Sequence, residues 1–351
     1  MYPLLKLPLF AYSHKDPEKA HLLAIKALKL LQTKAWALHL VRSLQSRGVG
    51  SEKGVDVCGI PFPNRIGLAA GFDKHGEVAP ALEALGFGFA ELGTATPKPQ
   101  PGNPRPRVWR IPYERGIVNA MGFNSYGADV FKRNFAENAS KVTIPIGISA
   151  GKNKDTPLED AAQDYISVIV TLAPYGHYIV ANISSPNTPG LRELQGGRYL
   201  EALVKAIIQA EKECRARLNL PPRPFFAKIA PDMNDRELDE TLEALTHAGA
   251  NGIIPANTTI TKPRSIWARN PDLAERQAGF SGPRTLFSRA CFIERICTKA
   301  PIFDVVGVGG IRNGGGARML LDSGAKAVQI YTGLIWEGPG VVRDIRMELA
   351  K

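Results

Sequence analysis

Eight short and almost wholly apolar segments recur along this chain of 351 residues, separated by amphipathic segments with helical periodicity. Continuous apolar runs that alternate with helical patterns are typical of parallel strands covered by helices on both faces. Eight such units predict an α/β fold, most simply a (β/α)8 TIM barrel, with a doubly wound open sheet as the alternative. The predicted strands are residues 66–70, 89–93, 144–149, 178–183, 225–229, 252–256, 304–308 and 327–330.

The organisation of the chain follows from this alternation. We expect the barrel to occupy residues 55–351, a Gly- and Ser-containing linker to occupy 46–54, and a small helical extension to occupy 1–45. The predicted helices of the barrel are residues 78–85, 125–138, 158–172, 199–218, 235–248, 285–298 and 315–322.

Polar residues and glycines follow all eight predicted strands. Turn chemistry would explain one such exit, but eight in succession favour an enzyme site, because barrel enzymes build their active sites at the carboxyl ends of the strands. Amides and hydroxyls suit a planar ligand rich in N–H and C=O groups, and a lysine can stabilise negative charge on a ring. The candidates on this rim are Lys74, Thr94, Asn119, Asn124, Asn182, Ser185, Asn187, Lys228, Asn257 and Thr258.

Glycines gather after the last two predicted strands, at residues 307–310 and at Gly333. Backbone N–H groups of such loops can approach a phosphate closely, and in barrels this is the usual phosphate site. The pattern predicts a phosphate-binding end of the site, and it leaves open whether the phosphate belongs to a substrate or to a cofactor.

Several other chemistries have no support in the sequence. The six histidines lack metal-ligand spacing, so we expect no metal site, and a GxSxG motif is absent. The four cysteines lack CxxC spacing, which favours reduced thiols. We expect neither a signal peptide nor a membrane-spanning segment, because lysines and arginines interrupt the apolar stretch near the N-terminus.

The positive charge is concentrated at the N-terminus. Residues 1–53 hold nine Lys and Arg against three acidic residues, which is six of the eleven net charges. Asp16-Pro17 predicts a helix start, with Asp16 as the N-cap, and a second helical run covers residues 35–44. Such a basic amphipathic pair suits an anionic membrane surface, although packing against the barrel would give the same pattern. The local charge argues against nucleic acid as the partner.

Several motifs resemble the dihydroorotate dehydrogenase family, in its quinone-dependent, membrane-associated class. In this family the catalytic base is serine in the membrane-associated class and cysteine in the soluble classes, and Ser185 occupies that position here. The similarity extends over nearly the whole chain. The matching segments are residues 16–21, 67–74, 93–103, 121–124, 151–156, 182–192, 306–311 and 329–331.

The resemblance implies an FMN-dependent oxidation of dihydroorotate to orotate in pyrimidine (UMP) biosynthesis, with a membrane quinone as the electron acceptor. Ser185 would take the C5 proton while a hydride passes from C6 to flavin N5. The implied substrate-binding residues are Lys74, Asn119, Ala120, Met121, Gly122, Phe123, Asn182, Asn187, Asn257 and Thr258. The implied cofactor-binding residues are Ala70, Gly71, Phe72, Asp73, Lys74, Thr94, Ser149, Asn182, Lys228, Ala256, Gly282, Gly310, Tyr331 and Thr332.

The resemblance also implies a peripheral enzyme on the cytoplasmic face of the inner membrane, with the N-terminal helices giving the quinone access to the flavin. We expect a monomer. The chain departs from the family pattern at Ser149, where Asn is usual, at Ala256, where Thr is usual, and at Ala120, where Arg is common. Two other hypotheses are a phosphate-binding barrel isomerase or lyase without a redox cofactor, and a catalytically inert, membrane-tethered binding protein.

Overall fold

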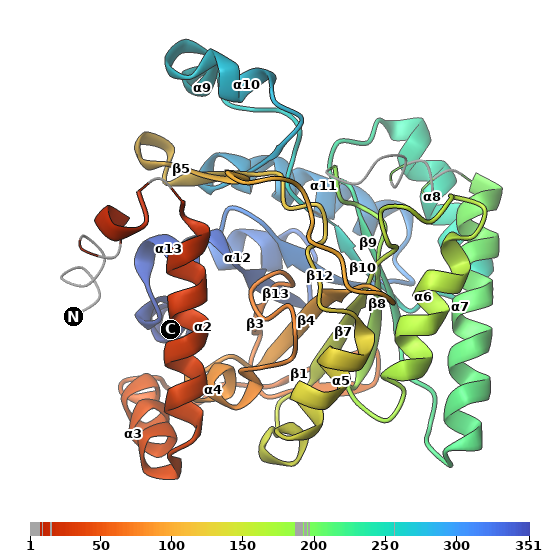
Figure 1. Ribbon diagram of the computed structural model, residues 1–351, viewed down its shortest axis with the longest axis horizontal. Helices are drawn as coiled ribbons and strands as arrows, with labels where there is room; N and C mark the ends of the chain where they lie inside the picture. Colours follow the sequence, from red (N-terminus) through yellow and green to blue (C-terminus); the bar gives the residue numbers. More distant parts are fainter. Residues whose placement is uncertain are drawn as a thin grey trace.

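A computed structural model describes residues 8, 10–14, 16–186, 192, 195, 197–255 and 257–351 (Figure 1). Its centre is a closed barrel of eight parallel strands, each of which is paired with its two neighbours. All eight predicted strands are present, with boundaries shifted by a few residues, so the barrel prediction is confirmed. In barrel order the strands are β3 (Ile66–Leu68), β4 (Phe89–Ala95), β7 (Ile146–Ala150), β8 (Tyr178–Asn182), β9 (Phe225–Ile229), β10 (Gly252–Pro255), β12 (Asp304–Val308) and β13 (Ala327–Ile330).

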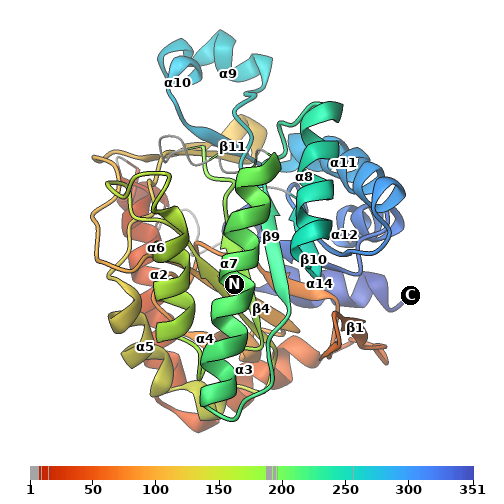
Figure 2. The same ribbon diagram turned by 90° about the vertical axis from the view of Figure 1, so that its right-hand side faces the viewer.

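Helices surround the barrel (Figures 1 and 2). Helix α8 (Asp235–Ala248) shows why the sequence pattern was informative: Asn234 and Glu237 form a reciprocal capping box at its start, and Gly249 adopts a left-handed conformation at its end. The other helices of the barrel are α4 (Ala79–Ala84), α5 (Ala128–Ala136), α6 (Ala161–Thr171), α7 (Gly197–Arg217), α11 (Leu286–Lys299), α12 (Gly314–Asp322), α13 (Thr332–Glu337) and α14 (Gly340–Leu349).

Aromatic side chains fill the amino-terminal end of the barrel. The hairpin of β1 (Val55–Val57) and β2 (Ile60–Phe62) lies there, and the Phe62 ring stacks on the Phe89 ring at 4.4 Å between centroids. Tyr178 and Phe226 belong to the same buried cluster. Phe62, Phe89, Tyr178 and Phe226 are at most 2% exposed, so solvent hardly reaches this end of the barrel.

A small antiparallel sheet, which the sequence analysis did not predict, lies beyond the carboxyl ends of the barrel strands. It pairs β5 (Val108–Ile111) with β6 (Gly116–Asn119), and β6 with β11 (Gly279–Ser281). Its strands are three or four residues long and come from distant parts of the chain, so no local sequence pattern predicts them. The helices α9 (Arg264–Arg269) and α10 (Pro271–Glu275) project on the same side in Figure 1.

Helices α2 (Glu18–Gln32) and α3 (Ala35–Ser46), in red and orange in Figure 1, precede the barrel. Pro17 occupies the N-cap position of α2, and the predicted cap, Asp16, accepts a hydrogen bond from the Glu18 N–H at 3.1 Å. Ala20 and Ile25 are buried, whereas large apolar side chains on both helices are exposed: Leu22, Leu23, Leu30, Trp36, Leu40 and Leu44. Among the described residues, no helix is long and apolar enough to cross a membrane.

Candidate active site

A single cavity of about 500 Å³ runs from the carboxyl ends of the barrel strands to the space between α2 and α13. A volume of this order is typical of small-molecule and cofactor sites. Eighteen of the predicted site residues line it, although they come from positions spread over more than 260 residues. They are Ala70, Gly71, Phe72, Lys74, Thr94, Asn119, Met121, Gly122, Phe123, Asn182, Ser185, Lys228, Asn257, Thr258, Gly282, Gly310, Tyr331 and Thr332.

Five predicted site residues do not line this cavity as it is described. Asp73 is fully buried, and its carboxylate accepts hydrogen bonds from the N–H groups of Glu77 and Val78, both at 2.8 Å, so it shapes the loop that carries Lys74. Ala120 has a backbone role, since its N–H donates to the Arg107 carbonyl at 2.8 Å. Ser149 is completely buried and contacts the hydroxyl of Thr94, which itself lines the cavity. Asn187 and Ala256 are outside the described residues.

A chain of hydrogen-bonded side chains crosses the base of the cavity. The Ser149 and Thr94 hydroxyls lie 3.0 Å apart, and the Asn182 amide donates to the Thr94 hydroxyl at 2.9 Å. On the other side, the Ser184 hydroxyl donates to the Asn182 carbonyl at 2.9 Å, and the Asn257 amide donates to the Ser184 hydroxyl at 3.1 Å. This chain fixes the amide orientations of Asn182 and Asn257, so their remaining polar atoms have defined directions.

Lys74 is a half-buried side chain in the wall of the cavity. Its Nζ donates to the Asn124 side-chain carbonyl at 2.8 Å. Burial lowers the pKa of Lys74 to about 7; the Glu18 carboxylate partly offsets the shift, and Arg107 and Arg105 add to it. An anion bound beside Lys74 would therefore favour the charged form of Lys74, and the lysine would take up a proton when the anion binds.

A buried polar layer lies at the base of the cavity; Lys228 was predicted as a site residue, whereas Glu91 and Gln329 were not. Lys228 on β9 donates to both carboxylate oxygens of Glu91 on β4 at 3.1 Å, and the Gln329 amide on β13 donates to Glu91 at 2.9 Å. Glu91 and Gln329 are completely buried. A carboxylate and an amide inside otherwise apolar strands are a usable signal, because an apolar core would exclude them unless they had a role.

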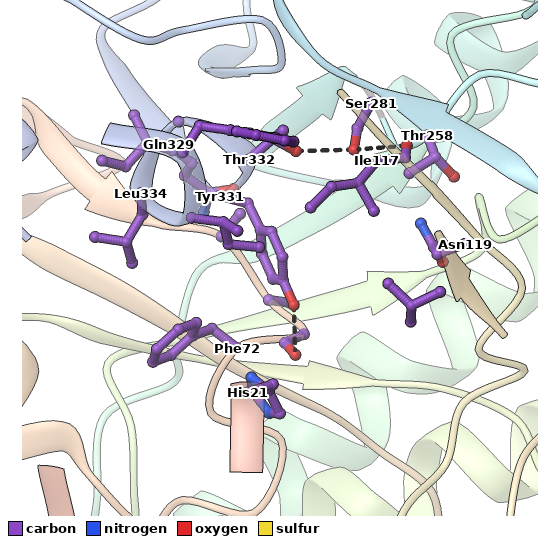
Figure 3. Close-up of a pocket in the computed structure, with 18 of the residues that line it drawn as sticks. His21, Phe72, Ile117, Asn119, Thr258, Ser281, Gln329, Tyr331, Thr332 and Leu334 are labelled. Carbon is purple, nitrogen blue, oxygen red and sulfur yellow. Dashed lines mark hydrogen bonds between the residues drawn. The ribbon is translucent and has the colours of Figure 1, made fainter. Parts of the chain in front are cut away.

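Glycines and hydroxyls form the end of the cavity at β13, as the sequence predicted for a phosphate. Gly282 and Gly310 line this end, and their φ values of 155° and 78° are ones that residues with a side chain rarely adopt. The Thr332 hydroxyl lies 2.8 Å from that of Ser281, and Figure 3 shows this pair on the same side of the cavity as Gln329. Ser281 was not predicted as a site residue.

The opposite end of the cavity is formed by helix α2. His21 lies edge-on to the Phe72 ring at 5.4 Å between centroids, near the bottom of Figure 3. Burial, with the charge of Lys74, lowers the pKa of His21 to about 3, so the imidazole is neutral at neutral pH. Glu18 fastens the helix to the barrel through Arg107 and Arg105. These contacts make α2 part of the site.

Ser185 lines the cavity at the end of β8 and is 5% exposed. Arg192 braces the adjoining backbone: its Nε donates to the Ser184 carbonyl at 3.2 Å, and its Nη2 donates to the Thr258 carbonyl at 3.3 Å. These contacts hold the backbone that carries Ser185 in place, and a base or nucleophile requires such a fixed position.

Two buried acceptors in the wall have no hydrogen-bond partner among the described residues: the Thr258 hydroxyl oxygen and the Gln329 carbonyl oxygen. Buried polar atoms are normally satisfied, so these atoms indicate a polar ligand with donors of its own. Together with the lysines and the glycine-lined end, they fit a flavin mononucleotide, whose ring is polar at one edge and whose phosphate needs backbone N–H groups.

Comparison with known proteins agrees with the site. The sequence model of the dihydroorotate dehydrogenase family matches residues 53–351. Proteins named dihydroorotate dehydrogenase (quinone) are similar: 42% identity to that of Neisseria meningitidis over all of both chains, and 42% to that of Acidithiobacillus ferrooxidans over 99% of this chain and 94% of that one. A crystal structure of dihydroorotate dehydrogenase from Eimeria tenella, in complex with ferulenol, has a TM-score of 0.79 and 31% identity, and 90% of each chain is covered. The chain belongs to the dihydroorotate dehydrogenase family of oxidoreductases.

Proposed function

We propose that this protein oxidises dihydroorotate to orotate with FMN as its cofactor and a membrane quinone as the acceptor, as a step of pyrimidine biosynthesis. The observation that carries the proposal is one cavity that is lined by Ser185, two lysines and several amides and that extends to residues of α2 and α13. The names of the similar proteins supply the quinone. An isomerase or lyase would need neither that extension nor the exposed apolar helices.

The cofactor would lie against the end of the cavity at β13. Gly282, Gly310 and Thr332 would hold the phosphate, and Lys228 would meet the ring. When bound, FMN supplies the acceptor for the hydride that leaves C6 of the substrate. Ser149 would act through Thr94, whose hydroxyl it contacts, because its own side chain stands behind the wall.

The substrate would lie between that ring and Ser185. The amides of Asn119, Asn182 and Asn257 would bind its N–H and C=O groups, and Lys74 would bind its carboxylate, with Asn187 as a further amide. Ser185 would remove the C5 proton, which together with the hydride accounts for the two electrons and two protons that dihydroorotate loses. A serine is a weak base, so its exact placement by the Arg192 contact to Ser184 is essential.

The N-terminal helices would bring the quinone to the cavity. Trp36 and Leu30 are 70% exposed, and α2 carries three lysines while α3 carries Arg42, which is the composition of a helix pair that lies in a membrane interface. The proposal includes a peripheral position on the cytoplasmic face of the inner membrane. The neutral His21 and the Tyr331 ring in the cavity wall would then line the route of the quinone head group.

The Ser185→Ala variant tests the assignment. The purified wild-type protein should be yellow and should form orotate only when a quinone is supplied. The variant should keep its flavin but lose flavin reduction by dihydroorotate near neutral pH, measured in an anaerobic stopped-flow experiment. A folded wild-type protein that neither contains nor takes up FMN contradicts the proposed cofactor, and undiminished reduction in the variant contradicts the role of Ser185.

The Trp36→Ser variant tests the membrane assignment separately. It should bind anionic vesicles more weakly and reduce a vesicle-embedded quinone more slowly, while its reaction with a water-soluble dye stays unchanged. Equal vesicle binding by the variant and the wild type would contradict the assignment.

A further inference from the structure

The polar layer of Glu91, Lys228 and Gln329 lies directly beneath the space assigned to the flavin ring. Lys228 and Gln329 both line the cavity, and Glu91 joins them from below. Both carboxylate oxygens of Glu91 accept from the Lys228 ammonium at 3.1 Å, and one of them also accepts from the Gln329 amide at 2.9 Å. All three side chains are at most 5% exposed.

Glu91 determines which way the Gln329 amide points. The NH2 group must face the carboxylate, because the alternative would set two acceptors against each other. The carbonyl oxygen is then turned away from Glu91, and it has no partner among the described residues although it is buried in the cavity wall. Figure 3 shows Gln329 on the wall formed by β13. A buried acceptor of this kind needs a donor from a ligand, and a flavin carries an N–H group at its pyrimidine end.

Glu91 also determines the charge beneath the ring. A lysine alone would add one positive charge in a place without solvent and would strongly favour the electron-rich, reduced form of a flavin. The Glu91 carboxylate lies 3.1 Å from the Lys228 ammonium, so at points farther away than this separation the two opposite charges largely cancel. The ring therefore meets a donor from Lys228 and an acceptor from Gln329, but little net charge.

We infer that Gln329 is a flavin-binding residue and that Glu91 is a positioning residue, which orients Gln329 and lowers the reduction potential of the flavin by neutralising Lys228. The inference rests on the proposed FMN cofactor. Lowering the potential would have a function, because a flavin with a lower reduction potential passes its two electrons to a quinone more readily.

The Glu91→Gln variant removes the charge and keeps the shape. Its carbonyl can still accept from Lys228, and its NH2 group can meet a rotated Gln329. We expect the flavin equilibrium to shift at least tenfold towards the reduced form, which is about 30 mV for a two-electron couple. The potential is measured by anaerobic titration against a reference dye at one fixed pH for all variants.

The Glu211→Gln variant is a matched control. Glu211 is 2% exposed and binds Arg223 at 2.6 Å and 2.7 Å, but it lies on α7 and does not line the cavity. It should leave the potential unchanged even if it lowers the unfolding temperature. An unchanged potential in Glu91→Gln, or equal shifts in both variants, overturns the role of Glu91.

The Gln329→Met variant tests the second half of the inference and does not depend on a folded Glu91 variant. It should raise the dissociation constant of FMN for the apoprotein at least tenfold, measured by quenching of flavin fluorescence. Gln45→Met, which changes the same side chain on α3, should leave that constant unchanged. An unchanged constant in Gln329→Met overturns the inference, whereas failure of the wild-type protein to bind FMN would instead refute the proposed function.

Discussion

The attachment of helix α2 to the barrel can be tested at Glu18. This carboxylate is 5% exposed and accepts hydrogen bonds from Arg107 Nε at 3.0 Å and Arg107 Nη2 at 2.8 Å, with Arg105 Nε at 3.0 Å. The Glu18→Gln substitution keeps the shape but leaves buried Arg107 without its counter-ion. Breaking a buried pair in this way costs about 3–5 kcal/mol. Arg107 keeps its hydrogen bonds to the carbonyls of Pro101 and Asn103, so we expect a value near the lower limit.

A loss of about 3 kcal/mol should raise the population of detached α2 roughly a hundredfold, because each 1.4 kcal/mol is a factor of ten. Hydrogen exchange followed by mass spectrometry should show faster exchange in α2, with little change in the barrel strands. Quinone reduction should fall more than dye reduction. The control is Lys29→Ala on the same helix: Lys29 is 50% exposed and binds Glu77 at 2.7 Å, and an exposed pair contributes at most about 1 kcal/mol.

Acid should weaken the same attachment in the wild-type protein. Burial tends to raise the pKa of Glu18, but the hydrogen bond and charge of Arg107, with the charge of Arg105, hold that pKa below its ordinary value. The stabilisation is therefore complete above the ordinary carboxyl pKa of about 4.5 and is lost as the pH falls through the lowered value. Equal exchange of α2 in Glu18→Gln and Lys29→Ala would refute the reasoning, as would unchanged protection in Glu18→Gln.

Three other measurements follow from the site. Because burial lowers the pKa of Lys74 to about 7, the affinity for anionic orotate should fall as the pH rises above 7, by up to tenfold per pH unit; a flat profile in spectral titrations from pH 6 to 9 would contradict this. Asp73→Asn should destabilise the fold by about 1–3 kcal/mol, seen in urea unfolding, since its NH2 group would face the Val78 N–H. Gly310→Ala should lower both the melting temperature and the affinity for FMN, because a Cβ would lie 2.6 Å from the Leu286 backbone. A variant whose melting temperature equals that of the wild-type protein would contradict this crowding.

The barrel could be predicted because its strands and most of its helices each follow a local sequence pattern. Residues 235–248 were placed correctly as a helix, since periodicity, capping box and terminal glycine all agree. The β5–β6–β11 sheet could not be predicted in this way, because β11 (Gly279–Ser281) pairs with β6, which lies about 160 residues earlier in the chain. The same limit applies to the cavity: rim residues that follow strands were predicted and line it, whereas the attachment of Glu18 to Arg107 is a contact that only folding creates.

Closure of the barrel has a consequence for biosynthesis of the protein. The strand that completes the ring is β13, which pairs with β3 from the opposite end of the barrel sequence, at Ile330 and Leu68. A chain emerging from the ribosome that stops before Ala327 has seven strands and two unpaired edges, which are prone to associate with other chains. It also lacks Gln329, Tyr331 and Thr332 and hence one wall of the cavity. A cofactor that needs this wall could bind only after β13 has been made, and nascent chains pass through most of their synthesis with an open sheet.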